Sequence, residues 1–262
     1  MNRHVPHQNS FDRAKSMEQW QIIVLIIATA LTIGSIALNG IDPTGVGFNV
    51  NNAIDMANAT ASLFAVVYII LDILINDRFY LAGKEKRLDL VDHAFETNLS
   101  GEQSSGYFNA QGINKGVYKL SVLSFENSLF TSETVKRMTY TKWGITLIIG
   151  VIFIISAALG NKMLVNNILQ IAATGILFQQ AIRLQQYSNR MSNIHADFKV
   201  LFNDLKTIAD KTSKEGEMIR NILNYEATHS WGSILSDDKI FNKLNPELSI
   251  KWNALKVSYN IN

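Results

Sequence analysis

Side chains with hydrogen-bonding chemistry interrupt the last of four apolar stretches in this 262-residue chain, and three of them share a regular spacing. Asn166, Gln170 and Thr174 stand at positions i, i+4 and i+8, so an α-helix would place them on roughly one side. Amide and hydroxyl groups in hydrocarbon need hydrogen-bond partners. The spacing therefore predicts either a hydrated path ringed by amides when several copies assemble, or hydrogen bonds that join neighbouring helices of a bundle.

An acidic residue, Asp72, lies near the end of the second apolar stretch. An ionisable side chain inside a membrane span is a candidate functional residue, and an acid at a channel mouth would favour cations. Asp72 is also only about one helical turn from the predicted cytoplasmic end of its span. The alternative interpretation is that its carboxylate simply reaches the membrane interface.

Patterns for catalysis and metal binding are weak. Asp89, His93 and Glu96 have the i, i+4, i+7 spacing that can place metal ligands on one helix face, but solvated helices commonly carry such groupings, and we predict no metal site. The Gly-x-Ser-x-Gly pattern of a serine nucleophile is absent around Ser104, and there is no glycine-rich phosphate loop ending in lysine. No nucleophile, base and orienting group come together, so the sequence predicts a protein that is not an enzyme and has no cofactor.

Charge and cysteine content exclude further classes. The chain has 24 basic and 22 acidic residues, a balance that gives no general case for nucleic-acid binding. It has no cysteine, which excludes disulfides, thiol catalysis and cysteine-based metal sites.

Four apolar runs are each about as long as the hydrocarbon core of a bilayer requires. They are residues 20–38, 59–75, 143–160 and 163–182. Only Asn161 and Lys162 separate the last two runs, which predicts an antiparallel helical hairpin. All lysines and arginines except Lys162 fall in segments that would share one side of the membrane, which predicts four spans with both chain ends in the cytoplasm.

The predicted fold is an all-α membrane protein with four transmembrane helices, a cytoplasmic helical loop domain and a C-terminal helical stalk. Its segments are a cytoplasmic N-terminus (1–19), a first transmembrane hairpin (20–75), a cytoplasmic helical domain (76–142), a second hairpin (143–182), and the stalk with a C-terminal helical segment (183–262). In the loop domain we expect helices over 80–96 and 117–138, the second bent near Phe130 and Thr131, with Ser132 as an N-cap. The helix of the last span should continue to about Thr212. Gly216 should then interrupt the helical structure before a short helix over 217–225.

One face of this long fourth helix changes chemistry along its length. Beyond the span it carries large apolar residues at alternating steps of three and four, the pattern of a coiled coil. These seam residues are Leu184, Tyr187, Met191, Ile194, Phe198, Leu201, Leu205 and Ile208. The face is polar where its neighbours are apolar and apolar where they are polar, so it should meet protein or a pore throughout. Either a homo-oligomer or the chain's own spans and loop could cover it.

Three stretches give a family resemblance. They are 86–95 (KRLDLVDHAF) after the second span, 127–131 (NSLFT) before the third, and the tail from 224–226 (NYE) to 249–252 (SIKW). With four spans arranged two plus two, the chain resembles the four-transmembrane S-4TM effectors of bacterial nucleotide-signalling conflict systems. The resemblance implies a pore-forming or membrane-disrupting protein of the bacterial inner membrane that is released when the cell senses phage. It carries over no catalytic residue, and no cyclic-nucleotide-binding domain is recognisable here.

The leading functional hypothesis is therefore an inner-membrane, multi-pass effector that oligomerises and permeabilises the bilayer, an abortive-infection type of antiviral defence. Its expected partners are the lipid bilayer, other copies of the chain, and a nucleotide second messenger or a sensor protein as the trigger. One alternative is a housekeeping ion channel or small-solute transporter, although no inverted repeat is evident. Another is a membrane-anchored scaffold that recruits a cytoplasmic partner.

Overall fold

The computed structural model describes residues 4–39, 49–105, 108, 110, 112–159 and 164–261. Within these ranges, only the backbone is described at 39, 152–153, 156–159 and 164–174. Every regular element in the described residues is a helix, which confirms the predicted all-α class. An isolated antiparallel bridge joins His4 to Ser105.

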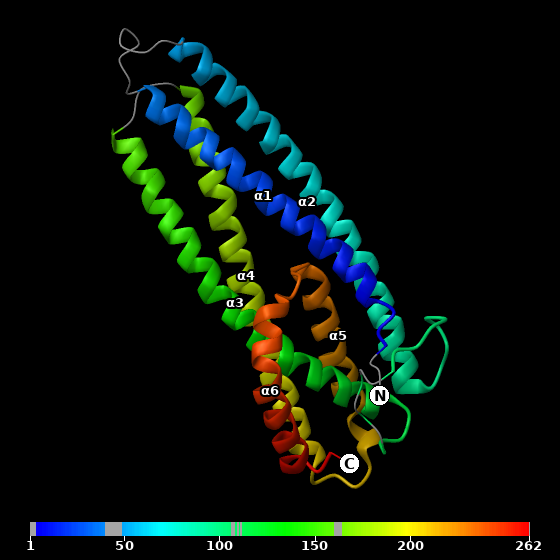
Figure 1. Ribbon diagram of the computed structural model, residues 1–262. Helices are drawn as coiled ribbons and strands as arrows, with labels where there is room; N and C mark the ends of the chain where they lie inside the picture. Colours follow the sequence, from blue (N-terminus) through cyan, green and yellow to red (C-terminus); the bar gives the residue numbers. More distant parts are fainter. Residues whose placement is uncertain are drawn as a thin grey trace. The chain divides into compact units, whose positions relative to one another are not determined.

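Four long helices form most of the chain (Figure 1). They are α1 (Gln8–Asn39), α2 (Val50–Phe95), α3 (Val117–Leu159) and α4 (Leu164–Leu205). A short 3-10 helix, η2 (Lys211–Lys214), and two further helices, α5 (Glu215–Gly232) and α6 (Asp238–Ser258), follow.

The helices belong to two compact units. The polar unit contains residues 1–12, 78–140 and 183–262, and the apolar unit contains residues 13–77 and 141–182. The boundaries fall inside α1, α2, α3 and α4, so each of these helices contributes residues to both units.

Among the described residues, two helices are long and apolar enough to cross a membrane, namely the stretch Gln8–Leu38 of α1 and the whole of α2. In their most apolar windows only 22% and 17% of the residues are buried. The core helix of a soluble protein would bury most of its apolar side chains, whereas most residues of these two windows are not buried within the described part of the chain. The third and fourth predicted spans include residues 156–174, whose side chains lie outside the described part of the chain.

Both apolar helices are longer than the predicted spans. α1 begins twelve residues before Trp20, and α2 runs from Val50 through the loop helix that we expected to be separate. Residues 76–79, which lie between the predicted second span and the predicted loop helix, contain neither glycine nor proline. The Asn76 amide donates to the carbonyl oxygen of Asp72 at 2.8 Å, one turn back, so this polar side chain is accommodated inside a continuous helix.

Helix α3 is also continuous, and the predicted bend near Phe130 and Thr131 is wrong. Ser132 is an interior helical residue rather than an N-cap, because its hydroxyl donates to the carbonyl oxygen of Leu129 at 3.0 Å. Thr139 donates in the same way to Val135 at 2.9 Å. Such back-bonding satisfies short polar side chains without ending the helix.

The predicted stalk is shorter than expected, because α4 ends at Leu205 instead of about Thr212. The chain then turns through hydrogen bonds from Thr207 N–H to the Asp204 carbonyl and from Ile208 N–H to the Leu205 carbonyl. Asp210 caps η2 by accepting from the backbone and hydroxyl of Thr212. Aspartates favour such turns because their side chains bond to nearby backbone N–H groups.

The returning chain forms two helices on the same unit. α5 includes Gly216, which does not break it, and ends where Ser233 adopts a left-handed conformation with φ of 46°. α6 starts at the N-cap Asp237, which accepts from the N–H groups of Lys239 and Ile240. The expected helix over 217–225 is therefore longer than predicted, and a second helix, α6, follows it.

Candidate functional site

The seam of α4 lies in the hydrophobic core of the polar unit. Its first seven residues are buried, while Ile208 lies beyond the end of α4 and is only partly buried. The partners of the seam are buried apolar residues of α3, α5 and α6 of the same chain: Val122, Phe125, Leu129, Val135, Met218, Ile222, Tyr225, Leu248 and Trp252. The chain itself therefore covers the apolar part of the seam, so this surface is not available to a second copy while the polar unit is folded.

Phe125 of α3 is the aromatic centre of this core. Its ring stacks on Phe202 with 4.9 Å between centroids and on Phe198 with 5.7 Å, and it meets the edge of Trp252 at 5.3 Å. These contacts join three helices at one fully buried side chain. Aromatic pairs of this geometry add about 0.5–1.5 kcal/mol each beyond simple burial.

A buried histidine accompanies this ring. His195 of α4 stacks on Phe125 at 5.2 Å, and its Nδ1 lies 3.1 Å from the hydroxyl of Ser128. Because that hydroxyl donates to the Phe125 carbonyl at 2.7 Å, its oxygen is left to accept a hydrogen bond from Nδ1 of His195. Burial lowers the pKa of His195 to about 4, with smaller effects of Lys199 and Lys251. His195 therefore contributes to packing in the core, and its contact with Ser128, 67 residues away, could not be predicted from sequence spacing.

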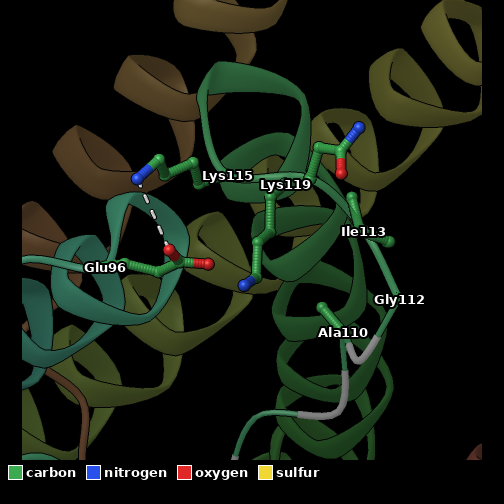
Figure 2. A pocket seen from close by; sticks show the side chains of 7 residues that line it. Glu96, Ala110, Gly112, Ile113, Lys115 and Lys119 are labelled. Atoms are coloured by element: carbon green, nitrogen blue, oxygen red, sulfur yellow. Dashed lines mark ion pairs between the residues drawn. The ribbon is translucent and has the colours of Figure 1, made fainter.

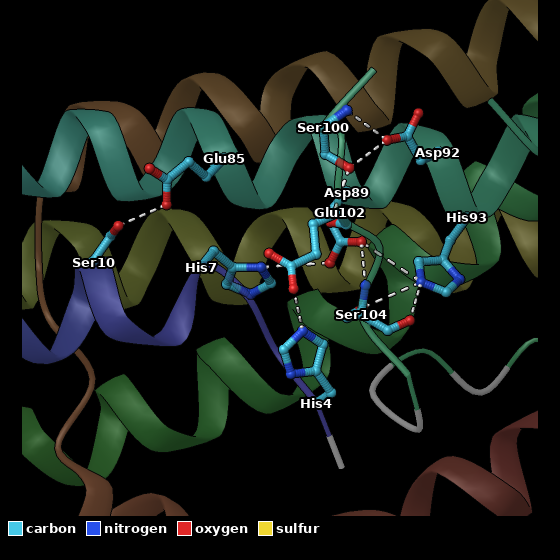
Figure 3. Close-up of polar contacts among 10 residues, drawn as sticks. All are labelled: His4, His7, Ser10, Glu85, Asp89, Asp92, His93, Ser100, Glu102 and Ser104. Carbon is cyan, nitrogen blue, oxygen red and sulfur yellow. Dashed lines mark hydrogen bonds and ion pairs between the residues drawn. The ribbon is translucent and has the colours of Figure 1, made fainter. Parts of the chain in front are cut away.

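A second cluster joins the N-terminal segment to α2 and the loop that follows (Figure 3). His7 Nδ1 lies 3.4 Å from Asp89 Oδ2, and both side chains are buried. His4 pairs with Glu102 at 2.9 Å, and its backbone forms the bridge with Ser105. Sequence reasoning missed this arrangement, because the histidines and carboxylates are more than 80 residues apart.

Asp89 also reaches into the loop. Its Oδ1 accepts from the backbone N–H of Ser104 at 3.0 Å and lies 3.6 Å from His93 Nε2. Burial acts to raise the pKa of Asp89, but hydrogen bonds from His7 and Ser104 outweigh it and lower the pKa. An ionised carboxylate thus holds the N-terminal segment and the loop on α2.

The Asp89, His93 and Ser104 side chains do not form a catalytic triad. His93 Nε2 lies 3.2 Å from the Ser104 hydroxyl, 2.8 Å from the Ser104 carbonyl oxygen and 3.6 Å from Asp89. A triad needs the serine and the carboxylate on opposite ring nitrogens, so that one orients the ring while the other transfers the proton. Here all three contacts fall on one nitrogen, which suits a structural link.

Asp92 organises the start of the same loop. Its carboxylate accepts from the Thr97 hydroxyl, the Leu99 N–H, and both the N–H and hydroxyl of Ser100, at 2.6–2.7 Å. Burial acts to raise the pKa of Asp92, but these four donors lower it to about 2. This side chain fixes the turn that follows α2.

Asp89, His93 and Glu96, which have the i, i+4, i+7 spacing, do not come together as one group in the structure. Asp89 and His93 meet as described, whereas Glu96 has a left-handed φ of 58° and pairs with Lys115 at 3.5 Å. Among the described residues, no group of three or more histidine, aspartate or glutamate side chains could hold a metal ion.

An open cavity of about 550 Å³ lies between the end of α2 and the start of α3 (Figure 2). Lys115 and Lys119 contribute two positive charges and Glu96 one negative charge, and the side chains of Asn114 and Ile113 complete much of the wall. The lining is therefore weakly cationic.

The polar candidates of the predicted spans are only partly described. Asn166, Gln170 and Thr174 belong to α4, but their side chains lie outside the described part. Asp72 Oδ1 accepts from Gln21 of α1 at 3.2 Å, and Asp72 Oδ2 accepts from Asn76 at 3.2 Å. For Asp72 the structure thus gives a bond between helices, in addition to the two interpretations from sequence.

One more amide forms a polar bridge inside the apolar unit. Gln180 of α4 accepts from Lys142 of α3 at 2.6 Å and donates to the hydroxyl of Tyr68 of α2. Interhelical hydrogen bonds of this kind join helices in an apolar surrounding.

No family model, curated protein or solved structure matches this chain.

Proposed function

We propose that this chain is an effector of the bacterial inner membrane that permeabilises the bilayer when its polar unit receives a signal. The observation that carries the proposal is helix continuity. α2, α3 and α4 each pass without a break from the apolar unit into the polar unit. A displacement of the polar unit would therefore be transmitted along three helices rather than lost in flexible linkers.

Helix α4 would be the moving part. In the apolar unit it carries Asn166, Gln170 and Thr174, and in the polar unit its seam is clamped by α3, α5 and α6. A rotation of α4 in the polar unit would turn the three polar residues relative to their neighbours. With several copies of the chain in contact, this rotation would line a hydrated path.

Assembly would use the apolar unit. The seam residues from Leu184 to Leu205 are buried in the core of one chain, so a homo-oligomer has to form through other surfaces. The exposed apolar faces of α1 and α2 supply such surfaces, and small exposed residues such as Ala30, Ala59 and Ser62 would allow close helix contacts.

The trigger would act on the polar unit. A nucleotide second messenger or a sensor protein is the kind of signal that the family resemblance implies. The cavity beside Lys115 and Lys119 is the place where a small anion would meet two cationic side chains.

Induced expression in bacteria with a potential-sensitive dye tests this function. We expect the wild-type chain to depolarise the cells under the triggering condition and Gln170→Leu to reduce the depolarisation at least several-fold, because it removes an amide from the path. Gln186→Leu is the matched control, since it makes the same change on an exposed position of the same helix in the polar unit. Unchanged potential with the wild-type chain, or equal effects of the two variants, would reject the proposal.

Exposed apolar side chains on the polar unit favour one second candidate, a membrane-anchored scaffold. Leu223 of α5 and Ile250 and Val257 of α6 are each more than 60% exposed. Cross-linking to one cytoplasmic partner without any loss of membrane potential would support the scaffold instead of the permeabilising effector.

A further inference from the structure

A charged groove runs between α3 and α6 of the polar unit. It has a volume of about 200 Å³, and its cationic walls are formed by Lys136 and Arg137 of α3 and Lys251 of α6. Two carboxylates, Glu133 and Glu247, also line it. The groove therefore has one more positive than negative side chain.

One of the two carboxylates already has an ion-pair partner. Glu133 accepts from Lys251 Nζ at 2.5 Å, and this bond ties α3 to α6. Burial acts to raise the pKa of Glu133, but the bond to Lys251 and the positive charges of Lys251 and Lys136 lower it, so the carboxylate is ionised. The other charged side chains that line the groove are Lys136, Arg137 and Glu247, and both Lys136 and Arg137 are exposed.

The groove residues of α3 lie close in sequence to the apolar run of the same helix, which bears on the kind of anion that the groove would meet. The apolar run of α3 begins at Trp143, and each helical residue advances ~1.5 Å. Tyr140 is thus only ~4.5 Å along the helix from Trp143, while Arg137 is ~9 Å and Lys136 ~10.5 Å from it. The headgroup layer on each side of a bilayer is about 5–8 Å thick, and long basic side chains reach further along the surface.

We propose that the groove between α3 and α6 binds the phosphate of an anionic phospholipid headgroup, with Lys136 and Arg137 as the phosphate ligands and Tyr140 at the lipid interface. The proposal rests on the membrane location of the proposed function. Its consequence is regulatory, because a bound headgroup would hold α6, and with it the Lys251–Glu133 bond, at the membrane surface.

Native mass spectrometry of the full-length protein in detergent tests the lipid site. The probes are phosphatidylglycerol and phosphatidylcholine with the same acyl chains. We expect the wild-type protein to retain phosphatidylglycerol in preference, and the double variant K136Q/R137Q to weaken that binding roughly tenfold. K239Q/K243Q is the matched control, because it removes the same charge from exposed positions of α6 outside the groove.

Three outcomes would overturn the proposal: unchanged phosphatidylglycerol binding in K136Q/R137Q, equal loss in K239Q/K243Q, or displacement of the lipid by inorganic phosphate, which would indicate a site for a free anion. If the double variant does not fold, the single variants K136Q and R137Q decide by the same criteria. Lipid retention is read without measuring conductance, so its failure leaves the permeabilising function standing. A failure of the membrane location itself would be seen separately, as protein in the soluble fraction.

Discussion

Replacing Gly232 with alanine is expected to destabilise the polar unit by about 3 kcal/mol, because the new methyl group has no space. An ideal Cβ at Gly232 would lie 2.4 Å from Cδ2 and 2.5 Å from Cε2 of Tyr187. The Tyr187 ring is only 1% exposed and is packed in the core against α3 and α5, so it cannot swing away. Thermal unfolding of the purified full-length protein should show an apparent Tm roughly 5–10 °C below that of the wild type.

Gly216→Ala is the matched control for this variant. It makes the same change in the same helix, at a position where an added Cβ meets nothing within 4 Å. It should leave the Tm unchanged or raise it slightly, since alanine restricts the unfolded chain. In a Tyr187→Ala background the cost of Gly232→Ala should largely disappear. A Gly232→Ala variant as stable as Gly216→Ala would show that the Tyr187 contact is not present in the protein.

Leu201→Asp should abolish the folded polar unit. Leu201 is 2% exposed and lies in the core shared by α3, α4, α5 and α6. The substitution removes apolar packing and buries an unpaired carboxylate, with a combined cost of more than about 4 kcal/mol. Limited proteolysis should cut residues 183–262 rapidly in this variant while the wild-type segment resists.

The neighbouring position provides the comparison. Val200 is 65% exposed on the same helix, so Val200→Asp should change stability by no more than about 0.5 kcal/mol. A Leu201→Asp protein that keeps the wild-type Tm but loses self-association in cross-linking would contradict the intrachain core. That result would instead place Leu201 against a second copy of the chain.

Several features of the fold could be predicted because they follow from local pattern. Apolar runs gave the long helices α1 and α2, and steps of three and four identified residues of α4 that are indeed buried. Periodicity shows that a face is buried but not what buries it. The pattern from Leu184 to Leu205 is the same whether its partner is a second copy or the chain's own α3, α5 and α6.

The errors arose at polar residues inside helices. Ser132 is of a type that favours helix caps, yet its hydroxyl bonds to the Leu129 carbonyl within α3. Phe125 and Leu129 of α3 are both buried in the core of the polar unit, a tertiary contact that local sequence does not reveal. The His7–Asp89 contact could not be predicted either, because it joins side chains from two segments that are distant in the sequence.

Cysteine labelling tests the central claim, four membrane spans with the polar unit in the cytoplasm, most directly. The chain has no cysteine, so each introduced cysteine is a unique reporter. In intact cells with a permeable outer membrane, a membrane-impermeant maleimide should label Thr44→Cys and Asn161→Cys, which fall between predicted spans. It should label Gln103→Cys and Ser213→Cys only after the inner membrane is opened. Labelling of Ser213→Cys in intact cells, or protection of Asn161→Cys, would contradict the account.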